Sequence, residues 1–351
     1  MASLEVETVI TVAVDAMGGD LGPEVVAEGV ARLSLEPVDI HVRLVGDRTA
    51  IQAALSRLRY DPTRLTVVDA DGHVAQHDDP RSVRDRPECS VARAVSLVAE
   101  GDSDAIVSSG NTGALIVAAS QQMPRIPGIR RAALAAVHPT EQKHGPKGDP
   151  FALILDVGAT ADADADSLVG FAAMGSAYSS IISEIRRPRV GLLSNGSEAH
   201  KGTPAIIEAH RVLADGPLHF VGNVEGLDIP RGSVDVIVTD GFIGNVVLKM
   251  LEGVGEVLRD VARKASSRRI EWKLGLSMLG GGLRELRKMT DWKAYGGAPL
   301  LGLDGVVIKA HGRSESRAIR NAVKVAAKAA SGDLTGKIRS TVAELGLEES
   351  P

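Results

Sequence analysis

Short apolar runs rich in Val, Ile and Leu recur along the chain and alternate with segments whose apolar residues repeat at helical spacing. Uninterrupted apolar runs are typical of strands that are covered on both faces, so this alternation predicts a three-layer α/β/α fold with a mainly parallel sheet. Strands are predicted at Val9–Asp15, Ile40–Gly46, Leu65–Asp69, Ala105–Ser108, Ala132–His138, Phe151–Val157, Arg189–Leu193, His219–Gly222 and Val234–Thr239. Helices are predicted at Pro23–Leu33, Arg48–Leu58, Ser90–Glu100, Thr112–Met123, Asp166–Glu184 and Thr203–Leu213, among others.

No feature of the sequence divides the chain into separate domains. It has no Pro/Ser-rich linker and no repeat with a period of about 20–50 residues, so residues 1–351 are predicted to form one α/β/α unit. The patterning is weakest at Asp69–Pro87 and Pro139–Asp149, which are predicted to be loops. The 38 glycines and the 3% of aromatic residues favour tight strand-to-helix turns over an all-β sandwich.

The charge and cysteine content narrow the range of partners. A net charge of −5 argues against a general nucleic-acid binder, which needs an excess of basic residues. A single cysteine excludes an internal disulfide framework and fits a reducing cytosol. The first residues have no basic segment before their apolar run, and no apolar run approaches the length of a membrane span. A cytoplasmic protein is therefore expected.

Six of the predicted strands end in turns made of glycine and small polar residues. In an open α/β sheet, ligands bind beyond the carboxyl ends of strands, and the N–H groups at a helix start attract anions. The set therefore predicts a site for a small anion such as phosphate, although each turn alone can simply connect a strand to a helix. Asp15 and Asp20 bracket the first turn and can either cap it or face a ligand. The six turns are 15–20, 108–114, 156–159, 194–198, 222–226 and 239–245.

The strings that form these turns also resemble a known family. VAVDAMGGD, SSGNTGAL, LILDVGA, RVGLLSNGSE, VGNVEG and VTDGFIGNVVLKMLEG stand in the order typical of the PlsX family, the phosphate acyltransferases of bacterial phospholipid synthesis. The segments Tyr295–Gly302 and Lys309–Gly312 continue the similarity. The resemblance covers the chain from about Val9 to Ala330.

The resemblance implies a fold similar to isocitrate and isopropylmalate dehydrogenases and shared with phosphotransacetylases. It implies that phosphate attacks the thioester of an acyl-acyl carrier protein to give acyl phosphate and free carrier protein, without a cofactor or metal. It also implies a homodimer that associates peripherally with an anionic membrane surface. The product would then pass to a membrane glycerol-3-phosphate acyltransferase.

The chain departs from the family pattern at three places. Thr160 stands where many relatives have Asn. Ser194-Asn195-Gly196 precedes Ser197-Glu198 where the family has Asn-Val-Gly before Thr-Glu. The segment 86–90 keeps only Ser90 of a basic-Ser-Ser pattern. These changes leave the acyl-chain preference and the pathway open, including a specialised acyltransferase of secondary metabolism. A nicotinamide-dependent dehydrogenase on the same fold is disfavoured, because no G-x-G-x-x-G follows the first strand. A non-catalytic scaffold would not need the polar strand ends.

Phosphate is already an anion at neutral pH, so the enzyme has to bind it, orient it and stabilise the oxyanion that forms. The turn Ser108–Gly113 is the leading phosphate cradle, and Lys201 stands at another helix start. The residues predicted to act in catalysis are Asn111, Lys201, Asp240, Asn245 and Lys249. The residues predicted to bind phosphate or substrate are Asp15, Gly18, Gly19, Ser109, Gly110, Thr112, Gly113, Asp156, Gly158, Glu198, Asn223, Gly241 and His311.

These assignments have structural alternatives. Asn111 can cap the following helix, Lys201 can be a solvated lysine, and Asp240 can tie down its own turn. His200 and His311 are more often structural or solvated than catalytic.

Two further residue patterns resemble functional sites but are predicted to be structural. Cys89 has no neighbouring His to activate it and is predicted to be a small buried residue. The alternation of Asp162, Asp164 and Asp166 resembles the start of a calcium loop but lacks the glycine and glutamate that such a loop needs, so a helix cap is expected.

A strongly basic segment lies near the carboxyl end of the chain. Between Arg259 and Lys293, ten Lys/Arg and four Asp/Glu give a charge of +6, against −11 for the remainder. Residues 255–293 are predicted to form a protruding basic helical hairpin that meets acidic carrier protein, anionic membrane or both. Alternatively, its apolar residues pack in a dimer interface. The predicted contact residues are Arg268, Arg269, Trp272, Lys273, Leu276, Leu279, Arg284, Arg287 and Lys288.

Overall fold

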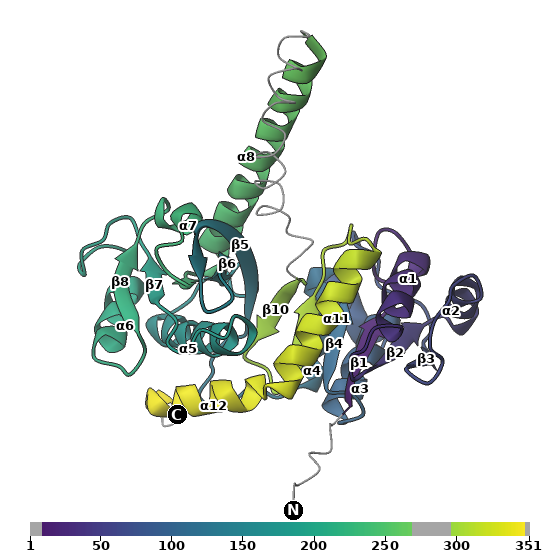
Figure 1. Ribbon diagram of the computed structural model, residues 1–351. Coiled ribbons are helices and arrows are strands. Elements are labelled where there is room, and N and C mark those ends of the chain that lie inside the picture. The colour runs from purple at the N-terminus through teal and green to yellow at the C-terminus, as the bar shows by residue number, and fades with distance from the viewer. Residues whose placement is uncertain (1–8, 269–295, 348–351) are drawn as a thin grey trace, which may run out of the picture.

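The computed structural model describes residues 9–268 and 296–347, which form an α/β structure around one eleven-stranded sheet (Figure 1). The strand order is β3-β2-β1-β4-β11-β10-β5-β6-β9-β7-β8. The strands are β1 (Ile10–Asp15), β2 (Ile40–Gly46), β3 (Leu65–Asp69), β4 (Ala105–Ser108), β5 (Ala133–His144), β6 (Asp149–Leu155), β7 (Val190–Leu193), β8 (Phe220–Val224), β9 (Val236–Val238), β10 (Ala298–Leu301) and β11 (Val306–Lys309).

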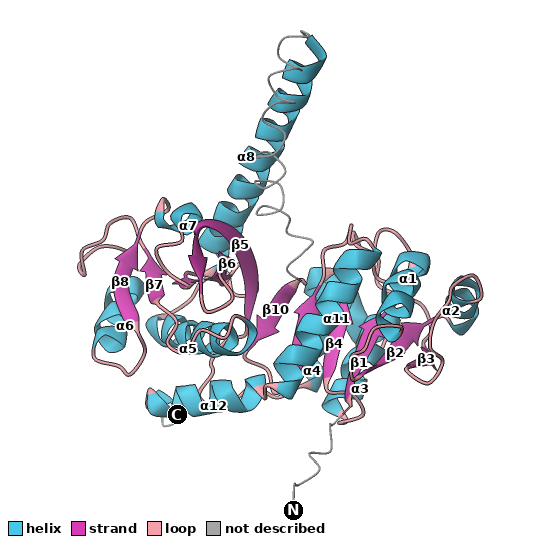
Figure 2. Ribbon diagram, in the orientation of Figure 1, coloured by secondary structure: helices cyan, strands magenta, loops and turns pink. Residues whose placement is uncertain are grey.

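Helices flank the sheet on both faces, as Figure 2 shows, which confirms the predicted α/β/α class. The helices are α1 (Pro23–Ser34), α2 (Arg48–Leu55), α3 (Ser90–Ala99), α4 (Thr112–Gln122), α5 (Ala165–Ile182), α6 (Pro204–Ala214), α7 (Asp228–Arg231), α8 (Gly241–Arg268), α11 (Ser316–Ser331) and α12 (Leu334–Glu344), together with the 3-10 helix η1 (Pro80–Asp85).

The sheet consists of two parallel halves that run in opposite directions. Strands β3, β2, β1, β4 and β11 are parallel to one another, and so are β6, β9, β7 and β8. The central strands β10 and β5 pair antiparallel with each other and with their outer neighbours. The polar turns at strand ends therefore fall into two groups, one for each half.

Successive residues of the strands point into two separate core layers. In β1, Val12 and Val14 pack with Ile319 of α11, whereas Ala13 lies in the opposite layer with Val95 of α3. This alternation between two buried layers explains why the strand has no polar face.

Two sequence predictions need correction. The predicted loop at Pro139–Asp149 is wrong, because β5 continues to His144 and forms a hairpin with β6. Strands β10 and β11 were not predicted. They are four residues each, too short for their pattern to be distinguished from the surrounding glycine-rich turns. The predicted loop at Asp69–Pro87 holds η1.

Helix α8 projects away from the body of the molecule (Figure 1). Its 28 residues correspond to about 42 Å at 1.5 Å per residue. This helix forms the described part of the predicted hairpin and ends at Arg268. The predicted contact residues Arg269, Trp272, Lys273, Leu276, Leu279, Arg284, Arg287 and Lys288 lie outside the described residues. In the described ranges, no helix is both long and apolar enough to span a membrane.

Candidate active site

The first group of turns follows three parallel strands whose last residues stand side by side. Asp15 of β1 is in register with Ser108 of β4, and Ser108 is in register with Lys309 of β11. Residues in register on parallel strands share one face of the sheet. Accordingly, the Ser108 hydroxyl donates to Asp15 Oδ2 at 2.7 Å, and all three side chains are buried.

The turns after β1 and β4 touch through their backbones. A Cβ on Gly18 would lie 2.5 Å from the Cα of Gly110, and a Cβ on Gly19 would lie 2.6 Å from Ser109 Oγ. Such distances leave no room for a side chain, so glycine is required for this contact. Gln76 completes the assembly, because its amide donates to the carbonyl oxygens of Ser109 at 2.9 Å and Gly18 at 3.3 Å.

Asn111 is buried, and its side chain is fully engaged with backbone groups. Its Oδ1 accepts from the N–H of Ala114 at 3.1 Å, which caps α4. Its Nδ2 donates to the carbonyl oxygens of Ala75, Gln76 and Asp78 at 3.1–3.2 Å. This geometry supports the helix-cap alternative, with Asn111 fixing the 75–78 loop against α4. Its catalytic assignment stays a prediction.

The start of α4 offers donors beside this loop. Within the described ranges, the N–H groups of Thr112 and Gly113 have no acceptor. A Cβ on Gly113 would lie 2.6 Å from Pro80, so η1 packs closely against this turn. Thr112 is half-buried and stands at the positive end of the helix.

Lys309 is a site residue that the sequence analysis did not select. Its ammonium group is buried, and its pKa is lowered to about 8 because burial disfavours the charge, whereas Asp15 and Asp20 act in the opposite direction. The sequence signal was a lysine that ends an apolar run directly before the Ala310–Gly312 turn. This turn is attached to the first one, since the N–H of Asp20 donates to Gly312 O at 2.9 Å.

The second group of turns is organised around Asp156, which is fully buried after β6. Its carboxylate accepts from the backbone N–H groups of Leu134, Gly158, Ala159 and Thr160 at 2.5–3.0 Å. Burial nevertheless raises the pKa of Asp156, and the hydrogen bonds counteract that rise only in part. Asp156 thus shapes its own turn, with Gly158 exposed at the surface.

Helix α8 begins directly on the Asp156 turn. Gly241 donates to Thr160 O at 2.8 Å, and Asp240 Oδ1 accepts from the N–H of Ile243 at 2.8 Å. Asp240 therefore caps the helix start, as its structural alternative predicted. A Cβ on Gly244 would lie 1.8 Å from the carbonyl oxygen of Asp156.

The predicted catalytic residues of α8 face solvent. The side chain of Asn245 is exposed and has no hydrogen-bond partner among the described residues. The ammonium of Lys249 pairs with Glu252 at 2.8 Å and is also largely exposed.

Lys201 lies on a loop that Asn223 holds in place. The Asn223 amide donates to Glu198 O at 2.9 Å and Lys201 O at 3.4 Å, and its oxygen contacts His210 Nδ1 at 3.0 Å. Lys201 is half-buried, and its ammonium has no partner in the described ranges. Its stem packs on Gly196, where a Cβ would lie 2.9 Å from Lys201 Cγ. The side chain of Glu198 is exposed.

His311 connects the two groups electrostatically. Partial burial lowers the pKa of His311 most, Lys309 and Lys249 lower it further, and Glu252 raises it. The pKa of His311 thus responds to charges on both β11 and α8.

Comparison with known proteins decides the family. A family model described as "Fatty acid synthesis protein" matches residues 10–337. The phosphate acyltransferase of Synechocystis sp. is 39% identical over 335 residues, which cover 95% of this chain and 94% of the relative. That of Exiguobacterium sp. is 41% identical over 330 residues, covering 93% and 97%. The chain belongs to the PlsX family of phosphate acyltransferases. It is an acyltransferase, as the resemblance predicted.

Solved structures confirm the fold that is expected for a PlsX protein. A phosphotransacetylase from Streptococcus pyogenes has a TM-score of 0.63 at 18% identity, covering 92% of this chain and 94% of that one. A branched-chain phosphotransacylase from Enterococcus faecalis has a TM-score of 0.55 at 14% identity, covering 92% and 99%. At such identities the similarity establishes the fold alone.

Cys89 is placed poorly for covalent catalysis in this PlsX protein. It is buried at the start of α3, and the pKa of its thiol is raised, mainly by burial and also by the charge of Asp15. A raised pKa removes the thiolate that a nucleophile needs.

We therefore expect Cys89→Ser to keep phosphate-dependent turnover close to that of the wild type. Release of carrier-protein thiol measures this, with circular dichroism as a control for folding. A folded but inactive variant would indicate an acyl-enzyme and contradict the expectation.

The calcium-loop pattern of the sequence is explained by a helix cap. Asp164 Oδ1 accepts from the N–H of Ser167 at 2.9 Å at the start of α5, and Arg130 pairs with Asp164 and Asp166. Within residues 9–268 and 296–347, no cluster of three or more His, Cys, Asp or Glu could hold a metal ion.

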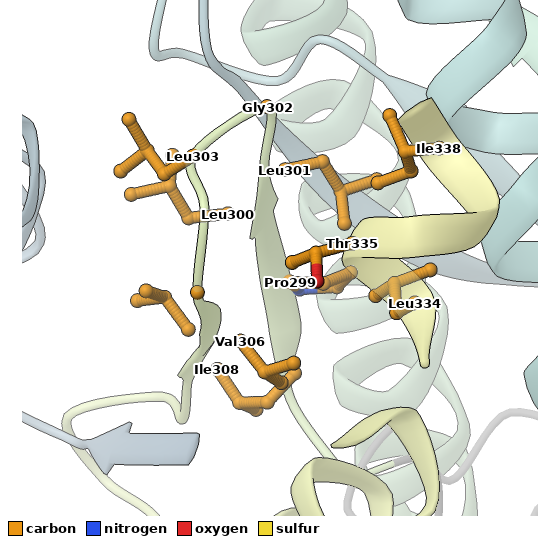
Figure 3. Close-up of a pocket in the computed structure, with 12 residues that line it drawn as sticks. Pro299, Leu300, Leu301, Gly302, Leu303, Val306, Ile308, Leu334, Thr335 and Ile338 are labelled. Carbon is orange, nitrogen blue, oxygen red and sulfur yellow. The ribbon is translucent and has the colours of Figure 1, made fainter. Parts of the chain in front are cut away.

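An apolar pocket between β10, β11 and the start of α12 lies apart from the polar turns (Figure 3). None of its lining residues carries an ionisable side chain, so the pocket does not suit a phosphate anion. The lining residues are Pro299, Leu300, Leu301, Gly302, Leu303, Gly305, Val306, Val307, Ile308, Leu334, Thr335 and Ile338.

Proposed function

We propose that this PlsX protein transfers the acyl group of an acyl-acyl carrier protein to inorganic phosphate. The products are acyl phosphate and the free holo-carrier protein. The observation that carries this proposal is the 39–41% sequence identity to phosphate acyltransferases over 93–95% of the chain. The meeting of the polar turns at 15–20, 108–113 and 309–312, together with the start of α4 and the buried Lys309, supports it.

The reaction balances without a covalent enzyme intermediate. An oxygen of hydrogen phosphate attacks the thioester carbonyl, so that a C–O bond forms and the C–S bond breaks. The proton that phosphate loses ends on the departing thiol of the carrier. The protein has to orient the phosphate and stabilise the negative charge on the carbonyl oxygen. We assign these tasks to the N–H groups at the start of α4, in the first group of turns, and to the Lys201 ammonium, in the second group. None of the described residues accepts a hydrogen bond from these donors.

One incubation tests the reaction class. Purified protein is mixed with acyl-acyl carrier protein and ³²P-labelled phosphate, and both acyl phosphate and free carrier thiol are measured. We expect the two products to form in equal amounts and only when phosphate is present. Thiol release without phosphate would indicate a thioesterase and contradict the proposal.

We further propose that residues 255–293 contact the acidic carrier protein and an anionic membrane surface, where a membrane glycerol-3-phosphate acyltransferase uses the acyl phosphate. The net charge of +6 between 259 and 293 supports this role. So does the row of exposed apolar side chains on α8, which comprises Phe242, Ile243, Val246, Met250, Val254, Val257, Leu258 and Val261. A homodimer that uses part of this row is the alternative.

We expect the double variant Val257→Glu/Val261→Glu to lose flotation with anionic vesicles, because it adds negative charge to an exposed apolar surface. Glu256→Gln on the same helix serves as the control and keeps flotation. Light scattering of the same samples reports the oligomeric state. If the wild type does not float and the double variant becomes monomeric, this row is a dimer interface and the membrane proposal fails.

A further inference from the structure

The ammonium group of Lys309 is buried but poorly satisfied. The residue is 7% exposed, and one hydrogen bond, to the carbonyl oxygen of Ala310, is what the described residues provide for its three N–H donors. None of the described carboxylates forms an ion pair with it. A buried charge without partners is costly, so a residue of this kind needs a reason to stay charged.

The charges around Lys309 come from three elements. Asp15 on β1 has both oxygens engaged, by the N–H of Met17 at 3.1 Å and by Ser108 at 2.7 Å. Asp20, on the turn after β1, acts on Lys309 through its charge and is exposed. His311 lies two residues after Lys309, on the turn that follows β11. Asp15 and Asp20 therefore act on Lys309 through their charge but accept no hydrogen bond from it, so two of its three N–H groups have no acceptor among the described residues.

Lys309 stands at the end of β11, next to the end of β4, from which the chain leads into α4. Lys309 is in register with Ser108, and α4 begins four residues after Ser108, at Thr112. The N–H groups of Thr112 and Gly113, which have no acceptor among the described residues, add positive potential at this end of the sheet. A helix start attracts a small dianion, and so does a buried ammonium, whose charge is little screened by water.

We infer that Lys309 binds the substrate phosphate by donating hydrogen bonds to its oxygens, together with the N–H groups at the start of α4. This inference rests on the proposed function and names a residue that holds its phosphate substrate. The competing interpretation is that Lys309 serves only as an internal counter-ion for Asp15.

The direction of the pH effect follows from the protonation of Lys309. Phosphate binds the charged form, so its affinity falls as pH rises above about 8, where free Lys309 loses its proton. Between pH 8 and 9.5 the protonated fraction falls by about fifteenfold, while phosphate stays a dianion. In the absence of phosphate the folded state binds fewer protons than the unfolded state between pH 8 and 10.5, so stability should rise with pH over that range.

The test is calorimetric titration of the full-length protein with inorganic phosphate at pH 8 and pH 9.5. We expect wild-type affinity to fall about tenfold or more between these values. We expect Lys309→Met to bind at least about tenfold more weakly at pH 8, with little further change at pH 9.5. Lys324→Met is the matched control, because Lys324 lies on α11 and its ammonium pairs with Glu36, outside the proposed phosphate site. It should bind phosphate like the wild type.

Thermal unfolding of the same variants at pH 7.5 separates the two interpretations. If Lys309 serves to bind phosphate, its buried ammonium is unfavourable in the phosphate-free protein because it has lost its hydration. Lys309→Met should then unfold at the same or a higher temperature than the wild type. Wild-type phosphate affinity in Lys309→Met overturns the inference, and so does a lowered Tm with unchanged affinity, which identifies a counter-ion. No carrier protein is involved, so a wild type that binds phosphate through Lys309 but forms no acyl phosphate refutes the proposed function alone.

Discussion

Replacing Lys201 by alanine is expected to lower phosphate-dependent turnover by about 10²- to 10³-fold, the usual loss when one donor to a developing oxyanion is removed. Stability should change little, because the ammonium has no partner among the described residues and the loop is held by Asn223. Initial rates at several phosphate concentrations, together with Tm, measure both effects. Lys337→Ala on α12 is the control and should match the wild type.

Asn111→Ala should behave differently, although it was predicted from sequence to act in the same chemistry. Its side chain caps α4 and holds three carbonyl oxygens of the 75–78 loop, so we expect turnover and Tm to fall together. Loss of the cap alone costs about 1 kcal/mol. Asn111→Asp keeps the capping oxygen but turns a carboxylate oxygen toward the three carbonyl oxygens, so it should destabilise the protein at least as much as Asn111→Ala. Reduced turnover at unchanged Tm would instead support direct catalysis by Asn111, and unchanged turnover in both Lys201→Ala and Asn111→Ala would refute the site.

The second large effect is expected at Gly244. A Cβ there would lie 1.8 Å from the carbonyl oxygen of Asp156, which is backbone and cannot rotate away. We expect Gly244→Ala to lower the free energy of unfolding by at least the upper end of the usual overpacking range of about 1–3 kcal/mol. It should also displace the start of α8 and abolish turnover. Urea unfolding and activity measure the two consequences.

Gly253→Ala on the same helix is the matched control. A Cβ at Gly253 has open space around it, so alanine there should stabilise the protein by about 0.5–1 kcal/mol. If both glycine variants are equally stable, the contact between α8 and the Asp156 turn is not tight in solution.

The sequence predicted those elements whose pattern is local. β1 and β4 were recognised as buried strands because their apolar residues alternate between two buried layers. The turns after them were identified by glycines that the Gly18–Gly110 contact requires. The carboxyl part of β5 was missed because its polar residues beyond Pro139 pair as an exposed hairpin. β10 and β11 were missed because Gly296, Gly297, Gly302 and Gly305 flank these two four-residue strands, so the segment resembles a series of turns.

In the candidate site, too, local sequence features were predicted correctly and long-range contacts were not. Polar residues at strand ends were found, but sequence could not show which side chains the backbone already occupies. Asn111, Asp156 and Asp240 look like free polar groups in the sequence and are engaged with N–H or carbonyl groups in the fold. Nothing in the sequence distinguished Lys309 from a solvated lysine, whereas in the fold it stands beside Ser108 and is buried.

The position of β10 and β11 at the centre of the sheet has a consequence for how the protein is made. Residues 298–309 join β4 to β5, yet they leave the ribosome after all nine other strands. Until then, two apolar strand edges stay open on the nascent chain, and open edges are templates for aggregation. The two halves can each begin to fold during translation, but the continuous sheet closes only after synthesis has passed residue 309.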